Sequence, residues 1–160
     1  MHKLLLPILP ILAVLTCAAL AEPPEPLSEL RKTLSSAAQQ KKLAFVLLGR
    51  PSCGNCNATK AMIKEGKIPV TSEDFVMADL NIDDAKTQGE FMRKYGKETF
   101  GNTLPFVVVT DSHGKALGSS GGYKSPEQWN ALLTAARSKV SNAPGGAPAP
   151  YSPFKTAPPK

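Results

Sequence analysis

Two cysteines in the segment "PSCGNCNATK", residues 51–60, are the residues most able to do chemistry. Cys53 and Cys56 have the CxxC spacing. Such a pair can form a local structural disulfide, supply part of a metal site, or exchange electrons with another disulfide. The rest of the sequence has to decide among these three uses.

The structural and metal-binding interpretations have little support in the sequence. In the chain-entropy model, a disulfide that closes so short a loop contributes roughly 2 kcal/mol, which is little for a domain with its own core. A closed zinc site needs four Cys or His ligands, and beyond Cys53 and Cys56 the chain after residue 21 offers only His113. We expect His113 to be a solvated turn residue, and we expect no metal and no cofactor. A local staple, or a metal site completed by carboxylates or a second chain, remain as alternatives.

Electron transfer has positive support, because Cys53 falls where an apolar strand is followed by a helix. The unpaired N–H groups and the dipole at a helix start favour a thiolate, which lowers the cysteine pKa. Arg50 adds a positive charge nearby. Cys56 lies one helical turn further on the same face, placed to attack a mixed disulfide at Cys53. Gly54 lets another chain approach closely, and we take Gly54 and Asn55 as candidate client contacts.

Alternating signals along the chain predict an α/β domain. The first half is expected to form a helix over 27–41, a strand over 43–48, a helix over 53–65 with Gly66 after it, and a strand over 75–82. A helix capped by Asp83 or Asp84 and ended by Gly96 follows. Strands over 105–110 and 116–120 come next, and a last helix begins at Ser125. This alternation favours a mainly parallel sheet covered on both faces, to which a hairpin adds one antiparallel strand.

The apolar residues of each helix predict the face that it buries. The expected sets are Leu27, Leu30, Leu34 and Ala38; then Ala58, Ala61, Met62 and Ile63; then Phe91, Met92 and Tyr95; and finally Trp129, Leu132, Leu133, Ala136 and Val140. The last helix also has a complete start signal. Ser125 is the expected cap, Pro126 occupies the first turn and Gln128 completes a capping box.

Residues 1–21 have the pattern of a secretory signal peptide. Lys3 precedes an apolar run over residues 4–15, and the small residues "ALA" at 19–21 form a cleavage site. Export places the domain in an oxidising compartment, where disulfides persist. We therefore expect a periplasmic or secreted protein. A lipid anchor through Cys17 is the alternative.

The remaining segments complete the domain organisation. Residues 22–26, "EPPEP", form a Pro-rich lead-in, residues 27–140 form one domain, and residues 141–160 form a Pro-, Ala- and Gly-rich tail expected to be disordered. The formal net charge is +6, but no basic run reaches five residues. Nucleic acid is therefore not expected as a partner.

The segments "VLLGRPSCGNCNATKAMI" and "NTLPFVVVTDSHGKALGSSGGYKSPEQWNALL" together resemble the thioredoxin superfamily. The resemblance implies a thioredoxin-like fold, with a central mixed sheet of about four strands flanked by helices and an extra N-terminal helix. It implies a redox-active Cys53–Cys56 disulfide, in which Cys53 attacks and Cys56 resolves. It also implies that Pro105 is cis beside the pair, and that the backbone of Leu104 pairs with the client chain.

Four positions depart from the pattern of that family. Ser52 stands where thioredoxins have Trp, Leu47 where they have a buried Asp that helps to move the proton of the resolving cysteine, and Asn57 where they have Lys. The middle pair is Gly-Asn instead of Gly-Pro. These differences indicate a specialised secreted relative, whose proton acceptor is water or another group.

The sequence as a whole predicts an extracytoplasmic thiol–disulfide oxidoreductase. Its expected partners are protein clients with a dithiol or disulfide and a membrane or periplasmic redox protein, and we expect a monomer. The absence of His between the cysteines slightly favours a reductant, since an added cation would stabilise the thiolate and the oxidising direction. The alternative is a binding protein with an inert Cys53–Cys56 disulfide; a metal-delivery role is a third possibility.

Overall fold

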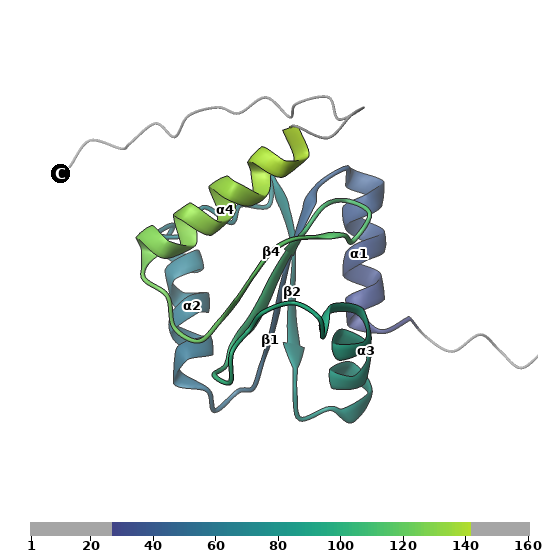
Figure 1. Ribbon diagram of the computed structural model, residues 1–160, viewed down its shortest axis with the longest axis vertical. Helices are drawn as coiled ribbons and strands as arrows, with labels where there is room; N and C mark the ends of the chain where they lie inside the picture. The colour runs from purple at the N-terminus through teal and green to yellow at the C-terminus, as the bar shows by residue number, and fades with distance from the viewer. Residues whose placement is uncertain (1–26, 142–160) are drawn as a thin grey trace, which may run out of the picture.

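The computed structural model describes residues 27–141, in which helices and strands alternate around one sheet (Figure 1). In chain order the elements are α1 (Glu29–Gln40), β1 (Leu43–Gly49), α2 (Gly54–Lys64), β2 (Phe75–Asn81), α3 (Ala85–Tyr95), β3 (Phe106–Thr110), β4 (Ala116–Gly121) and α4 (Pro126–Ser141). The expected signal peptide, Cys17, the lead-in and the tail beyond residue 141 lie outside the described residues. No helix over residues 27–141 is both long and apolar enough to cross a membrane.

The sheet is mixed, with the strand order β2-β1-β3-β4. β1 is parallel to β2 and antiparallel to β3, and β4 is antiparallel to β3. The expectation of a mainly parallel sheet was therefore wrong. After α3, residues 96–105 carry the chain back to the end of β1, so that Phe106 pairs with Leu48 and β3 runs in the opposite direction.

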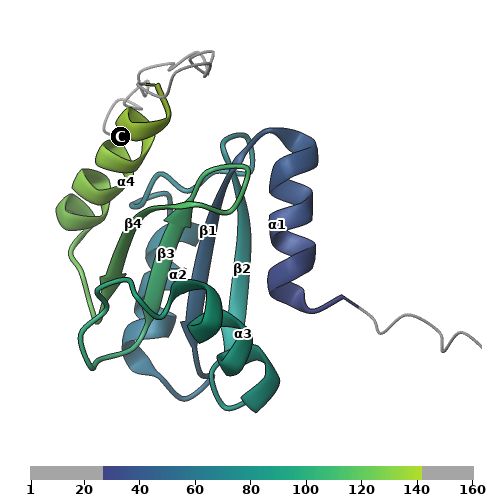
Figure 2. The same cartoon turned by 45° about the vertical axis from the view of Figure 1, so that its right-hand side comes forward.

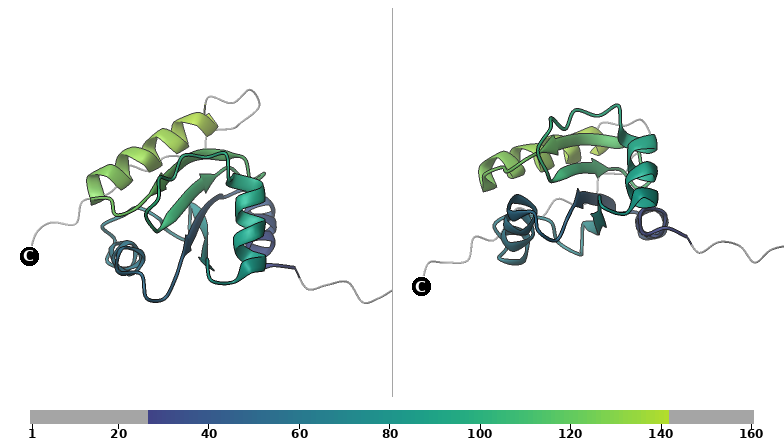
Figure 3. Two further views of the ribbon diagram at one scale, coloured as in Figure 1. Left: turned by 60° about the horizontal axis from the view of Figure 1, so that its bottom comes forward. Right: turned by 90° about the horizontal axis from the view of Figure 1, so that it is seen from below.

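Two helices cover each face of the sheet (Figures 2 and 3). α2 and α4 pack on the face to which β1 contributes Phe45 and Leu47, together with Trp129 of α4. α1 and α3 pack on the other face, to which β1 contributes Val46 and Leu48. β1 is apolar throughout because it is central and buried on both faces, from Ala44 to Gly49.

Three of the four predicted helix faces need correction. Leu27 precedes α1 and is 54% exposed, whereas Met92 of α3 is 42% exposed. Ala38 and Ala61 are exposed as well, although both were expected to be buried. The buried positions include residues that the apolar pattern missed, namely Thr33 and Ala37 of α1 and Thr59 of α2. These small side chains let a helix pack close to the sheet, so hydrophobicity alone does not identify them.

The helix ends agree with their sequence signals. The carboxylate of Asp84 accepts the Thr87 N–H at 2.9 Å, and this hydrogen bond lowers the pKa of Asp84. Gly66 follows α2 with a φ of +72°. Ser125 and Gln128 form the expected capping box, with N···O distances of 3.0 and 3.4 Å.

Candidate redox site

Cys53 is the N-cap residue of α2. It has extended φ and ψ of −81° and 110°, and its Sγ accepts the backbone N–H of Cys56 at 3.1 Å. This places the sulfur in the usual position of a capping oxygen, at the positive end of the helix. The predicted position of Cys53 at the start of a helix is confirmed.

Cys53 and Cys56 form a disulfide, with their Cα atoms 5.3 Å apart. The two halves of this disulfide differ in exposure. Cys56 is fully buried in the cluster between the sheet, α2 and α4, whereas Cys53 is half-buried at the edge of that cluster. Of the two residues, only Cys53 is in part exposed to solvent.

Gly49, the last residue of β1, makes room for the buried sulfur. A Cβ atom at Gly49 would lie 2.7 Å from the Sγ atom of Cys56 and 3.2 Å from the side chain of Leu47. In the sequence, Gly49 marks only the end of the strand expected over residues 43–48. No local sequence signal reveals this role, because the contact depends on how α2 folds back over β1.

Leu104 and Pro105 lie in the segment that leads into β3. The Leu104–Pro105 peptide bond is cis and Pro105 is buried. The side chain of Leu104 packs against the cluster that contains Cys56. The amide Nδ2 of Asn55 donates a hydrogen bond of 3.3 Å to the carbonyl oxygen of Leu104. The structure thus brings Leu104 into contact with Asn55 and with the cluster that contains Cys56, although these predicted site residues lie far apart in the sequence.

The charged groups near Cys53 are paired with one another. The guanidinium of Arg50 lies 3.1 Å from the carboxylate of Asp83, and both side chains are exposed. The backbone carbonyl of Arg50 accepts the N–H of Cys53 at 3.1 Å. Gly54 is exposed, and a Cβ atom at this position would meet no atom within 4 Å. The predicted effects of Arg50 on the Cys53 pKa and of Gly54 on client approach stay predictions.

Leu47 is fully buried in the same cluster as Cys56. An acidic side chain on this sheet face instead belongs to the neighbouring edge strand, where Asp79 pairs in register with Leu47. Asp79 binds Lys60 of α2 at 2.9 Å. Asp79 and Lys60 line a groove together with Gly49 and Asn57. The groove therefore extends from the edge of the sheet to Gly49, which lies next to Cys56.

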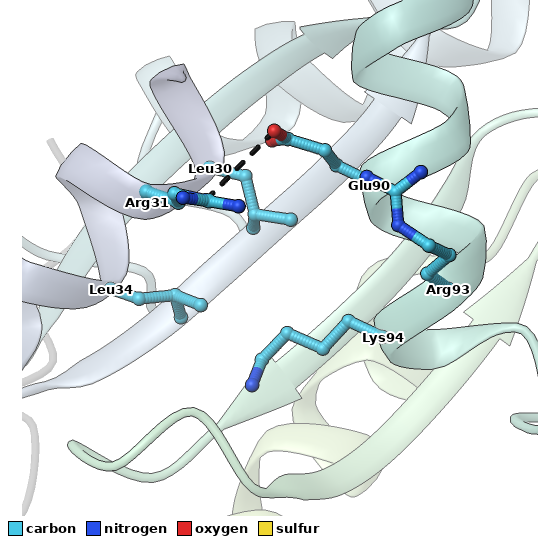
Figure 4. Close-up of a pocket in the computed structure, with 6 residues that line it drawn as sticks. All are labelled: Leu30, Arg31, Leu34, Glu90, Arg93 and Lys94. Carbon is cyan, nitrogen blue, oxygen red and sulfur yellow. Dashed lines mark ion pairs between the residues drawn. The ribbon is translucent and has the colours of Figure 1, made fainter. Parts of the chain in front are cut away.

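The far face of the sheet carries a second groove between α1 and α3 (Figure 4). Leu30 and Leu34 form its apolar wall, and Arg31 lies 3.9 Å from Glu90 across it. Glu90 is mostly buried, and its Oε2 atom has no hydrogen-bond partner among the described residues. This groove lies across the sheet from the cysteine pair and plays no part in its geometry.

His113 lies in the turn between β3 and β4, as expected. His113 is exposed, and its backbone N–H donates to the carboxylate of Asp111 at 2.8 Å. Over residues 27–141, no three His, Cys, Asp or Glu side chains gather closely enough to hold a metal ion.

Comparison with known proteins gives one family match. A model of the thioredoxin-like domain matches residues 30–137, whereas no curated protein matches the chain. Among solved structures, the disulphide isomerase from Xylella fastidiosa Temecula1 is 19% identical, with a TM-score of 0.48 over 67% of this chain and 76% of that one. A malarial protein is 12% identical, with a TM-score of 0.44 over 58% and 94% of the two chains. The family match spans nearly the whole described domain and includes Cys53, Cys56 and Pro105, so the chain belongs to the thioredoxin-like domain family.

Proposed function

We propose that the protein is an extracytoplasmic thiol–disulfide oxidoreductase that exchanges electrons with protein clients through Cys53 and Cys56. The observation that carries this proposal is the asymmetry of the pair at the start of α2. Cys53 is partly exposed and its Sγ accepts a backbone N–H, whereas Cys56, to which it is bonded, is fully buried. The apolar segment at residues 1–21 supports the location, and N-terminal sequencing of the mature protein would test it by showing whether the chain begins after Ala21.

The chemistry in the reducing direction takes two displacements. The thiolate of Cys53 attacks one sulfur of a client disulfide, and the other client sulfur leaves as a thiolate that takes up a proton. Cys56 then loses its proton and attacks the Sγ of Cys53, which expels the second client sulfur. Two electrons and two protons pass to the client, and the Cys53–Cys56 disulfide remains.

The backbone around Leu104 suits an extended client chain. The N–H of Leu104 donates to no described group, and its carbonyl accepts only from the Asn55 side chain. The unpaired N–H, and the carbonyl if Asn55 releases it, could pair with a peptide as an added strand, which would hold the client cysteine at the point of attack. Leu104 and Pro105 would thus form the docking edge, with Gly54 leaving space beside it.

No Asp or Glu over residues 27–141 is buried beside Cys56 to receive its proton, and Leu47 is buried in the same cluster. We propose that water takes this proton at the groove beside Gly49, where Lys60 and Asp79 form an open ion pair. The same surroundings support the reducing direction. The one nearby guanidinium, on Arg50, is paired with Asp83 and so adds little positive charge at Cys53.

Two measurements test the proposed function together. In the reduced protein, the pKa of Cys53 should lie below its ordinary value of about 8.5, because the helix start and the Cys56 N–H stabilise the thiolate. This pKa follows from the pH dependence of thiolate absorbance. The Cys56→Ala variant should trap mixed disulfides in an extract of its own cells, and the matched Cys53→Ala variant should trap none. An ordinary pKa without trapped partners would instead support the binding protein with an inert disulfide.

A further inference from the structure

The side chain of Asn55 forms a hydrogen bond with the Leu104 carbonyl, which a docked client would also need as an acceptor. Asn55 lies between the two cysteines in the first turn of α2, and its Nδ2 reaches the carbonyl oxygen of Leu104 at 3.3 Å. This contact links the active-site helix to the segment before β3, 49 residues away along the chain. It is the one hydrogen bond that this carbonyl accepts from a described residue.

An extended client would bring its own N–H to the same oxygen. A client cysteine bonded to Cys53 would lie close to Asn55, which is two residues further along the chain and contacts Leu104. A carbonyl has two lone pairs, and the half-buried Leu104 packs against the same cluster that contains Cys56. A client N–H aimed at this oxygen would meet the Asn55 amide already bonded to it.

We propose that Asn55 is a specificity-determining residue that keeps the Leu104 carbonyl occupied until an extended backbone displaces it. This inference rests on the proposed function and concerns the choice of client. A peptide or unfolded protein segment can replace the lost hydrogen bond with its own N–H. A small disulfide has no backbone to pair and leaves the Asn55 contact in place. The Asn55 side chain thus lowers the reduction rate of peptide disulfides relative to that of small disulfides, because a peptide must first displace it from the Leu104 carbonyl.

The test compares two substrates across three proteins. The substrates are an unstructured peptide with an internal disulfide and bis(2-hydroxyethyl) disulfide, and the readout is the ratio of their second-order reduction rates. For Asn55→Ala this ratio should rise about five-fold over the unsubstituted protein, which is the usual net effect of one hydrogen bond. Asn57→Ala is the matched control. It also removes an amide-to-carbonyl bond in the first turn of α2, to Pro51 at 3.0 Å, but on an exposed residue away from Leu104, so the ratio should stay unchanged.

The possible results separate the two levels of the proposal. A ratio that falls in Asn55→Ala would mean that the amide supports peptide docking, and an unchanged ratio would mean that it plays no part; either would overturn the inference alone. An unsubstituted protein that reduces neither substrate would contradict the proposed function, and the inference with it. Circular dichroism and reduction of the small disulfide show whether each variant has kept its fold and its cysteine pair.

Discussion

At the scale of single residues, the packing around Cys56 depends on the absence of a side chain at Gly49. We expect Gly49→Ala to destabilise the protein, since the added methyl group would lie 2.7 Å from the Sγ atom of Cys56. Overpacking of this kind typically costs about 1–3 kcal/mol. Denaturant unfolding of the oxidised protein measures this loss of stability. Gly54→Ala is the control, because its methyl group would enter open space on a helix that favours Ala. Equal midpoints for the two variants would contradict the packing argument.

The same scale shows what a sequence can and cannot predict about this site. Cys53, Gly66 and Ser125 were placed correctly, because caps depend on residues within one helical turn. Gly49 and the bond from Asn55 to Leu104 join parts of the chain that meet only after folding. Nothing next to Gly49 in the sequence distinguishes a glycine that ends a strand from one that accommodates a sulfur atom.

At the scale of elements, α3 is held by the buried hydroxyl of Tyr95. This hydroxyl donates to the carbonyl of Gly114 at 3.2 Å, next to the turn between β3 and β4. Burial, and then the charges of Asp111 and Glu98, raise the pKa of Tyr95. In the unfolded chain the same group ionises near pH 10. Above that pH the unfolded state binds fewer protons than the folded state, so stability falls as pH rises.

This linkage predicts how Tyr95→Phe behaves in alkali. The unsubstituted protein should be the more stable one near neutral pH, and its advantage should shrink as pH rises through about 10. Urea unfolding of both proteins across this range measures the difference, and the lysines cancel because both proteins contain them. Tyr123→Phe, at a position that is 53% exposed, should show no such trend. A constant difference between Tyr95→Phe and the unsubstituted protein would contradict the assigned linkage.

The direction of β3 was the main error in the predicted arrangement of elements. Alternating strands and helices suggest parallel neighbours, but here residues 96–105 fold back before β3 begins. Contacts of Phe100 help to hold that segment. Phe100 stacks on Phe106 with ring centroids 5.3 Å apart, and its carbonyl lies where a Cβ atom of Gly121 would be. Hydrophobic periodicity contains no information on such a return, because it reports burial and not strand direction.

At the scale of the whole molecule, the cysteine pair is part of the core. Cys56 belongs to the same buried cluster as Trp129, the only tryptophan of the chain, which packs against Phe45 with ring centroids 5.7 Å apart. Because this cluster joins β1, α2 and α4, its loss should accompany global unfolding. The fluorescence of Trp129 therefore reports the stability of the whole domain in either redox state.

That signal gives a test of the proposed reducing direction. Since the redox and unfolding equilibria form a closed cycle, a low reduction potential requires the disulfide to stabilise the folded state. We expect the oxidised protein to be more stable than the reduced one, with each 1.4 kcal/mol lowering the potential by about 30 mV relative to the unfolded chain. Unfolding followed by Trp129 fluorescence, with and without a dithiol reductant, measures this difference. In a strong oxidant the reduced form is the more stable one. If the reduced form of this protein were the more stable one, the reducing direction would be ruled out, but the proposal that Cys53 exchanges disulfides with clients would still stand.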